Sequence, residues 1–342
     1  MSSNLTTYGD ISPRTAGFAK RKLLERGQHL LVTERFGQVD PQQRNKTKTV
    51  KWRRYNSLAR ATAPLAEGIP PTGSKLTHTD VEATLEQYGD SIKLTDVIMD
   101  THEDPVLNES MTVCGEQAAE TIEEIRINIL KAGTNVYYSN FPSTSARTSV
   151  NSPPVRGDFR RIYRDFKKNK CREISSIVRA SAMISTEPVE SAYFMMGHTD
   201  LDADLRGMSG FIPSAQYSDS TKRLPGEMGK IEQFRIVLTA MFTAWSAAGT
   251  SGTTYLSGGV RVTSAASCDV YPCILVGRDA YGIVPLQGRS AVTPMVLNPG
   301  KPSKSDPLGQ IGWVSWKTYQ TGAILNSNWL ARLEAGATAA PS

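Results

Sequence analysis

The stretch PVLNESMTVCGEQAAETIEEIRINILKA, residues Pro105–Ala132, carries the clearest structural signal in this sequence. Asp104 suits the N-cap, Pro105 the first helical position and Gly133 the position after the end. One apolar series recurs every three or four residues: Leu107, Met111, Cys114, Ala118, Ile122, Ile125 and Ile129. The spacing predicts an amphipathic helix about 42 Å long, which buries one continuous face.

On the N-terminal side, the sequence predicts a long hairpin. Lys48–Tyr55 and Val81–Val97 are rich in β-branched and aromatic residues, and the Pro- and Gly-containing segment Leu58–Thr79 separates them. A loop of this length predicts a projecting hairpin. Before it, the first 45 residues read as an extended arm with a short helix at about Ala16–Gln28.

On the C-terminal side, the pattern predicts a mixed layer of helices and strands. A second helix is expected at Arg156–Lys168 and a short one, capped by Thr199, at Thr199–Arg206. The second helix presents an apolar side made of Phe159, Ile162, Tyr163 and Phe166. Strands are expected at Ile174–Ser181, Ser191–His198, Asp269–Gly277 and Ile311–Leu325. These elements indicate a mixed α/β layer. The long hairpin, the long helix and the long terminal strand together predict an elongated molecule.

Composition restricts the class of protein. The 342 residues include 39% hydrophobic and 21% charged residues, too apolar a mixture for a disordered chain. The longest apolar stretch is too short to span a membrane, and the N-terminus lacks the pattern of a signal peptide. The four cysteines are scattered without a CxxC pair, so reduced, buried thiols are expected. The net charge of +6 permits an anionic partner.

No catalytic, cofactor or metal site is predicted. Gly229-Lys230 and Gly300-Lys301 are not followed by the Ser or Thr of a phosphate-binding loop. The acids at 200, 202 and 204 lack the Gly and Glu of a calcium loop, and alternate positions diverge on a helix. A solvated, acidic helix start is the better interpretation.

Two basic clusters stand out. The larger comprises Arg156, Arg160, Arg161, Arg164, Lys167, Lys168, Lys170 and Arg172. Contact with nucleic acid phosphates is one interpretation, and a solvated face or ion pairs with acidic neighbouring subunits is the favoured one. The smaller comprises Lys46, Lys48, Lys51, Arg53 and Arg54 beside Trp52, where charge commonly protects a strand edge.

Taken in order, several stretches resemble the major capsid proteins of tailed bacteriophages, in the coat-protein family named for phage N4. The resemblance covers nearly the whole chain. It is carried by TTYGDISPRTAGFAKRKLLERGQ (Thr6–Gln28), LLVTERFGQVDPQQRNKTKTVKWRRY (Leu30–Tyr55), LTDVIMDTHEDPVLNES (Leu94–Ser110), HTDLDADLR (His198–Arg206), DVYPCILVGRDAYGIVPL (Asp269–Leu286) and SKSDPLGQIGWVSWKTYQTGAIL (Ser303–Leu325).

That resemblance implies the Hong Kong 97 type capsid fold, an α+β fold with five parts. Residues 1–44 would be the N-terminal arm and 45–95 the extended hairpin loop. Residues 96–154 would form the peripheral domain with its spine helix at 105–132, and 155–299 the axial domain. Residues 300–342 would supply a return strand of the peripheral domain, running from Ile311 to Leu333, and the C-terminal tail.

The function implied by the resemblance is structural. Copies would associate into hexamers and pentamers and close an icosahedral shell around double-stranded DNA, in a virion assembled in the host bacterial cytoplasm. Portal, scaffolding and decoration proteins would be partners, and the DNA would lie nearby without specific contacts. Candidate subunit contacts are Trp52, Arg53 and Arg54; candidate contacts to phosphate or to acidic neighbours are Arg160, Arg161, Arg164, Lys167 and Lys168. A nanocompartment shell around protein cargo is the nearest alternative, and a basic DNA-binding protein a more distant one.

Overall fold

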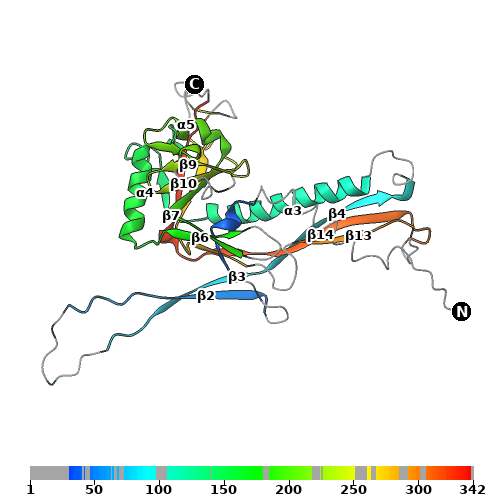
Figure 1. The fold of residues 1–342 in the computed structure, drawn as a ribbon, viewed down its shortest axis with the longest axis horizontal. Helices are drawn as coiled ribbons and strands as arrows, with labels where there is room; N and C mark the ends of the chain where they lie inside the picture. The colour runs from blue at the N-terminus through cyan, green and yellow to red at the C-terminus, as the bar shows by residue number, and fades with distance from the viewer. Residues whose placement is uncertain are drawn as a thin grey trace.

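The computed structural model describes residues 31–40, 42, 47–62, 64, 68, 73–97, 106–139, 141–179, 185–217, 224, 226–250, 260–262, 267–284, 292–300 and 306–339. The predicted arm helix and the N-cap at Asp104 lie outside these residues. A block of helices and strands forms one end of the molecule, a helix on a sheet extends from it to the other end, and a hairpin projects beyond the block (Figure 1). The predicted elongated shape is confirmed.

The long helix is α3, Val106–Lys131, within one residue of its predicted bounds at each end. Met111, Cys114, Ala118 and Ile122 are buried as predicted, but Ile125 and Ile129 are only partly buried. Further along α3, the buried residues are Glu123, Arg126, Ile127 and Leu130. The buried side changes because the first part of α3 packs on one sheet and the last turns pack on another.

The first of these sheets has the strand order β13-β14-β4. Its strands are β4 (Glu86–Thr95), β13 (Thr293–Leu297) and β14 (Ile311–Gln320), all antiparallel to their neighbours. Trp316 and Val314 of β14 face α3 in a shared apolar cluster. Gln117 of α3 receives a hydrogen bond from Trp316 Nε1 at 3.0 Å and donates one to Asp90 at 2.6 Å, so it ties the helix to two strands.

The second sheet has eight described strands in the order β5-β16-β11-β7-β10-β9-β8, with β6 paired to β7. The strands are β5 (Val136–Tyr138), β6 (Ile174–Arg179), β7 (Ser185–Gly197), β8 (Phe211–Pro213), β9 (Glu227–Ile231), β10 (Phe234–Leu238), β11 (Tyr271–Val276) and β16 (Leu330–Ala335). Successive β7 residues point to opposite faces: Tyr193 and Met195 join one core cluster, Phe194 and Met196 another. This sheet is therefore buried on both sides.

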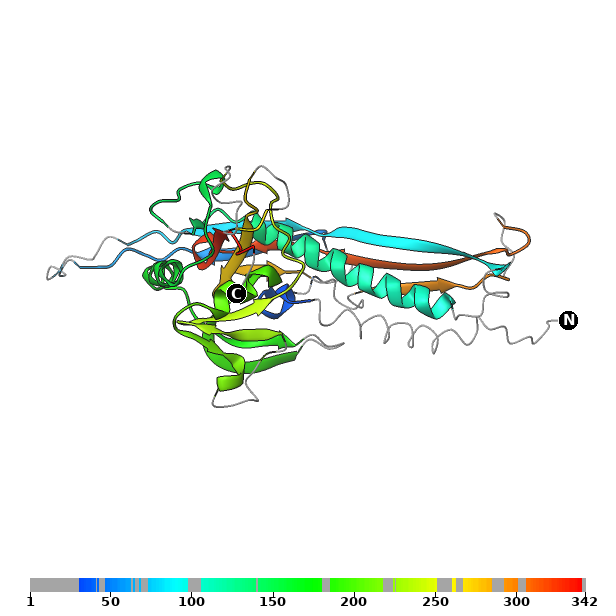
Figure 2. The same cartoon turned by 90° about the horizontal axis from the view of Figure 1, so that it is seen from above.

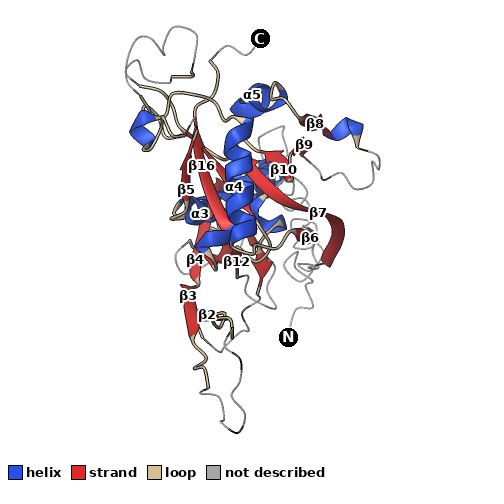
Figure 3. Cartoon of the chain, turned by 90° about the vertical axis from the view of Figure 1, so that its left-hand side faces the viewer, coloured by secondary structure: helices blue, strands red, loops and turns tan. Residues whose placement is uncertain are grey.

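Helix α4, Arg156–Lys168, has the predicted bounds and covers one face of that sheet (Figure 3). Phe159, Ile162 and Phe166 are fully buried, and Phe166 and Phe234 both pack on the ring of Tyr193. The other face is covered by the last turns of α3 and by Val32 and Phe36. The apolar periodicity therefore predicted the buried side of α4, whereas the α3 residues that pack on this sheet, Ile127 and Leu130, lie outside the predicted apolar series.

The hairpin differs from the prediction in its second strand. Strand β2 (Thr49–Tyr55) pairs with β3 (His78–Thr84), whereas the expected strand Val81–Val97 divides at the buried Leu85 into β3 and β4. Beyond Leu85 the chain changes partner from β2 to β14. The two strands still form one nearly continuous ribbon along the molecule (Figure 2).

Two other predicted elements are corrected. The strand expected at Ile311–Leu325 ends at Gln320, and β15 (Gly322–Ile324) then pairs with β12 (Tyr281–Ile283) in a third sheet with β1 (Gln38–Val39). The chain then enters the eight-stranded sheet as β16. The return strand expected from Ile311 to Leu333 is therefore three separate strands, β14, β15 and β16. The acidic turn begins with a 3-10 helix, η3 (Thr199–Leu201), before α5 (Asp202–Arg206), and its side-chain cap is His198, not Thr199.

Candidate subunit interface

The hairpin carries a basic surface far from the cores. Residues 47–62, including β2, contain five Lys or Arg and no acid. Val50 and Trp52 point to one face of β2 and Lys51 and Arg53 to the other, because a strand alternates. On the outer face, Lys51 pairs with Glu82 and Arg53 with Asp80 across the hairpin. Arg54 and Arg60 are exposed further along.

Arg53 and Asp80 form a two-pronged pair, with Arg53 Nε 2.9 Å from Oδ1 and Nη2 3.0 Å from Oδ2. The hydrogen bonds from Arg53 hold the pKa of Asp80 below its ordinary value. The pair stiffens the hairpin across its width and leaves the guanidinium at the surface.

Trp52 anchors the hairpin to its own chain. A Cβ on Gly282 of β12 would lie 2.9 Å from Trp52 Cζ2, so the indole lies directly on that glycine. Trp52 also packs beside the cluster of Val50, Leu85 and Val284. A role for Trp52 between subunits stays a prediction, and within the chain it fixes the root of the hairpin.

The basic residues of α4 have different surroundings. Arg160 donates to Glu232 at 2.8 Å and shares that carboxylate with Arg156, at 2.6 Å, and these hydrogen bonds lower the pKa of Glu232. Arg161 donates to Tyr138 O at 3.2 Å and lies over the rings of Tyr137 and Phe141.

Lys167 pairs with Glu173 at 2.7 Å, and this hydrogen bond raises the pKa of the ammonium group. Arg164 and Lys168 are exposed on the outer side of α4. The structure therefore does not bring the five candidates into one site: three have partners within the chain, and two face outward on a solvated surface.

An acidic surface escaped the sequence prediction. Glu109, Glu120 and Glu124 are exposed along α3, and no Lys or Arg is exposed on that helix. We name these three residues the acidic ridge. The sequence shows the glutamates, and only the packing of α3 shows which ones reach the surface.

The acids after β7 do not form a metal site. Asp200 pairs with Arg261 and accepts a hydrogen bond from Tyr271 Oη at 2.7 Å. Asp202 pairs with Arg206, whereas Asp204 accepts hydrogen bonds from Thr338. Within the described residues, no group of three or more His, Cys, Asp or Glu is placed to hold a metal ion. All four cysteines are buried and free, as predicted.

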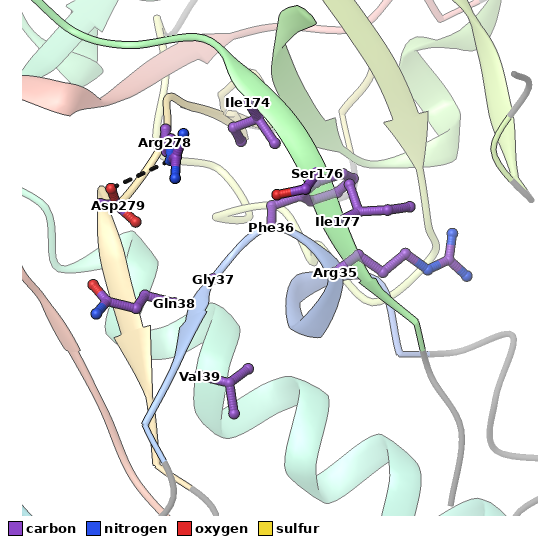
Figure 4. Close-up of a pocket in the computed structure, with 10 residues that line it drawn as sticks. All are labelled: Arg35, Phe36, Gly37, Gln38, Val39, Ile174, Ser176, Ile177, Arg278 and Asp279. Atoms are coloured by element: carbon purple, nitrogen blue, oxygen red, sulfur yellow. Dashed lines mark ion pairs between the residues drawn. The ribbon is translucent and has the colours of Figure 1, made fainter. Parts of the chain in front are cut away.

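A hollow of about 230 Å³ lies between β1 and β6 (Figure 4). Phe36, Val39, Ile174 and Ile177 supply its apolar walls, and Arg278 pairs with Asp279 at its rim. The side chains of Arg278 and Asp279 are 3.6 Å apart, and the polar lining also includes Arg35, Gln38 and Ser176. No helix in the described part of the chain is both long and apolar enough to cross a membrane.

Comparison with known proteins identifies the family of this chain. The model of the phage capsid protein family matches residues 79–332, from the outer part of the hairpin to β16. The chain belongs to the phage capsid protein family. It is therefore a structural protein of a phage capsid, while the narrower grouping named for phage N4 stays a prediction.

Individual proteins similar to this chain agree with this family. The chain is 22% identical over 269 residues to the major capsid protein of Pseudomonas phage KPP21, covering 74% of this chain and 67% of that protein. Its fold is similar to the capsid of Ralstonia phage GP4, with a TM-score of 0.63, 12% identity and 91% of each chain covered. It is also similar to a Synechococcus elongatus encapsulin, with a TM-score of 0.52, 10% identity, and 87% of this chain and 84% of that one covered. The predicted Hong Kong 97 type fold is confirmed.

Proposed function

We propose that this capsid protein is the major subunit of an icosahedral shell, in which copies associate as hexamers and pentamers around double-stranded DNA. The observation that carries the proposal is the separation of two oppositely charged surfaces. The basic hairpin extends beyond one end of the molecule, whereas the acidic ridge lies on α3, which extends the other way (Figure 1).

These surfaces complement each other only between copies. The outer part of the hairpin points away from α3 in both views of the long axis, so it does not reach the ridge of its own chain (Figures 1 and 2). When one patch of a subunit binds a different patch of the next subunit, the copies form a closed ring if the rotations between successive subunits add up to a full turn. Many such contacts of modest strength stabilise a closed shell through multivalency.

Under this proposal, Arg54 and Arg60 face a neighbouring subunit's acidic ridge, and Arg53 supports the hairpin from its other face. Arg164 and Lys168 of α4 face solvent or an acidic neighbour. Portal, scaffolding and decoration proteins are proposed partners because the family resemblance implies them. The DNA would be held by enclosure and not by specific contacts, in a virion assembled in the bacterial host.

Charge exchange tests the contact. Arg54→Glu with Arg60→Glu should abolish shells, and Glu120→Lys with Glu124→Lys should do the same, as seen by electron microscopy of nuclease-treated protein. Combining all four substitutions should restore shells in part. Glu190→Lys, an exposed reversal elsewhere, is the control. Normal shells from either double variant would contradict the contact, and dispersed wild-type subunits even beside the other phage head genes would contradict the shell itself.

A nanocompartment is the second candidate because the encapsulin has a similar fold. The contents of shells purified from phage-infected cells separate the two. Packaged DNA of genome length supports the capsid, and a single co-purifying enzyme without DNA supports the compartment.

A further inference from the structure

A short segment joins the two parts of the molecule that the proposed shell uses. We name residues Leu31–Asp40 the strap. It contains the 3-10 helix η1 (Thr33–Arg35) and β1, and it precedes the hairpin in the chain. Phe36 of the strap stacks on Phe194 with ring centroids 4.2 Å apart. β1 runs parallel to β12, so Gln38 lies opposite Gly282.

Glu123 of α3 holds the beginning of the strap. Its side chain has no exposed surface. Oε1 accepts hydrogen bonds from the backbone N–H groups of Val32 and Thr33, at 3.1 and 2.9 Å, and Oε2 accepts one from Thr33 Oγ1 at 2.6 Å. The N–H groups at the start of a helical turn have no acceptor within it, so the carboxylate caps η1 from another element.

Other groups close around this contact. Arg126, also on α3, donates to Glu34 of η1 at 3.2 Å and to Gln320 of β14 at 3.1 Å. Tyr281 of β12 donates its hydroxyl to Thr33 O. Arg35 is nearly buried on the same turn, and its charge interacts with Glu123.

A buried carboxylate is a costly way to fill space, because an apolar side chain of similar volume packs without losing hydration. The carboxylate instead specifies where η1 lies, because its three accepted hydrogen bonds fit only one position of that turn. The strap then continues as β1 to Gly282, the residue on which Trp52 of the hairpin lies. One path of contacts therefore leads from α3 through the strap and β12 to the root of the hairpin.

We propose that Glu123 is a latch that couples α3 to the hairpin through the strap, so that the helix sets the direction in which the hairpin leaves the body. When α3 shifts, the strap, Gly282 and Trp52 shift with it. The latch adjusts the reach of a subunit toward its neighbour from inside its own fold. The coupling needs only the contacts within one chain, whereas its effect on a neighbouring subunit rests on the proposed function.

Hydrogen exchange on the dispersed full-length subunit tests the latch. In Glu123→Ala, amides of residues 31–40 should exchange at least tenfold faster than in the wild type, and those of β2 should also exchange faster. Asn128→Ala, at an exposed position of α3 outside the acidic ridge, is the control and should leave both segments unchanged. Equal strap exchange in the two variants would overturn the latch, and a faster strap with an unchanged β2 would overturn the coupling.

A less disruptive variant tests the latch even if Glu123→Ala does not fold. Thr33→Val removes one of the three accepted bonds and keeps the shape of the side chain. It should accelerate the same two segments by a smaller factor. Thr121→Val, which removes a hydroxyl bonded within α3 to Gln117 O, is its control. Equal exchange in Thr33→Val and Thr121→Val would count against the latch even if Glu123→Ala does not fold.

Discussion

Gly89 of β4 lies against the backbone of Trp316 in β14 so closely that a Cβ on the glycine would be 2.5 Å from Trp316 O. Gly89 pairs directly with Lys317, and Trp316 pairs directly with Asp90, so Gly89 and Trp316 are diagonal neighbours across the two strands. No side chain fits here without moving one strand away from the other.

Gly89→Ala should therefore destabilise the subunit by about 1–3 kcal/mol, the usual cost of forcing atoms into a packed site. Denaturant unfolding followed by fluorescence measures it. Gly73→Ala is the matched control, since nothing lies within 4 Å of a Cβ there and its backbone needs no positive φ. Equal stability of the two variants would show that the β4–β14 contact is looser than described.

Removing the ring of Phe166 should destabilise the subunit strongly. The side chain is fully buried between Tyr193 and Phe234, so Phe166→Ala should cost about 3–5 kcal/mol. Lys168→Ala, two residues later and exposed, should change the free energy of unfolding by less than about 0.5 kcal/mol. A small effect at Phe166 would mean that α4 does not cover the sheet in solution.

The buried Glu123 predicts a pH dependence of stability. Burial raises the pKa of this carboxyl, although the hydrogen bonds from Thr33 and the charge of Arg126 act in the opposite direction. A carboxyl with a raised pKa in the folded state favours folding most below its ordinary pKa, and this contribution is lost as the pH rises through the raised value.

Glu123→Gln cannot titrate, so the difference in unfolding free energy between wild type and variant should change across that interval. The wild type should lose stability relative to the variant as the pH rises from about 4. Chemical denaturation at a series of pH values measures the difference. A difference that is constant with pH, or that changes in the opposite direction, would contradict the raised pKa.

The Arg53–Asp80 pair predicts the opposite dependence for the hairpin. Since its hydrogen bonds lower the pKa of Asp80, the pair persists as the pH falls through the ordinary aspartate range and is lost only below it. Exchange of the β2 and β3 amides, after correction for intrinsic exchange, should therefore be faster in Asp80→Asn than in the wild type at pH values above the lowered pKa of Asp80. The two proteins should converge as the pH falls through that pKa, because the side-chain amide of the variant cannot titrate. Identical profiles would show that the pair does not stiffen the hairpin. Because both groups are exposed, the melting temperature of the whole subunit should stay unchanged.

The parts of this fold that depend on local periodicity could be predicted from the sequence. Helix α4 has its predicted bounds, and α3 differs by one residue at each end, because apolar spacing and terminal residues define a helix locally. The division at Leu85 could not be predicted in this way. It arises because the chain changes from β2 to β14 as its partner, and β14 lies more than 200 residues away.

The candidate interface was predictable only in part. The basic residues of the hairpin are visible as a run in the sequence. Glu123 and Glu124, by contrast, are adjacent and chemically identical, yet one is fully buried and the other exposed. The difference arises because the buried side of α3 changes along the helix. That change depends on the sheet against which each part of α3 packs, and not on the apolar spacing of α3 itself.

The nearly continuous ribbon of β3 and β4 has a mechanical consequence. A neighbour that pulls on the hairpin along its length would pull β4 lengthwise past β14, to which it is paired at ten consecutive positions. The hydrogen bonds between those strands lie across the direction of pull and would carry the tension together, instead of opening one after another from an end. In a shell under internal pressure, the shear strength of this entire strand pair would thus resist the tension in every subunit.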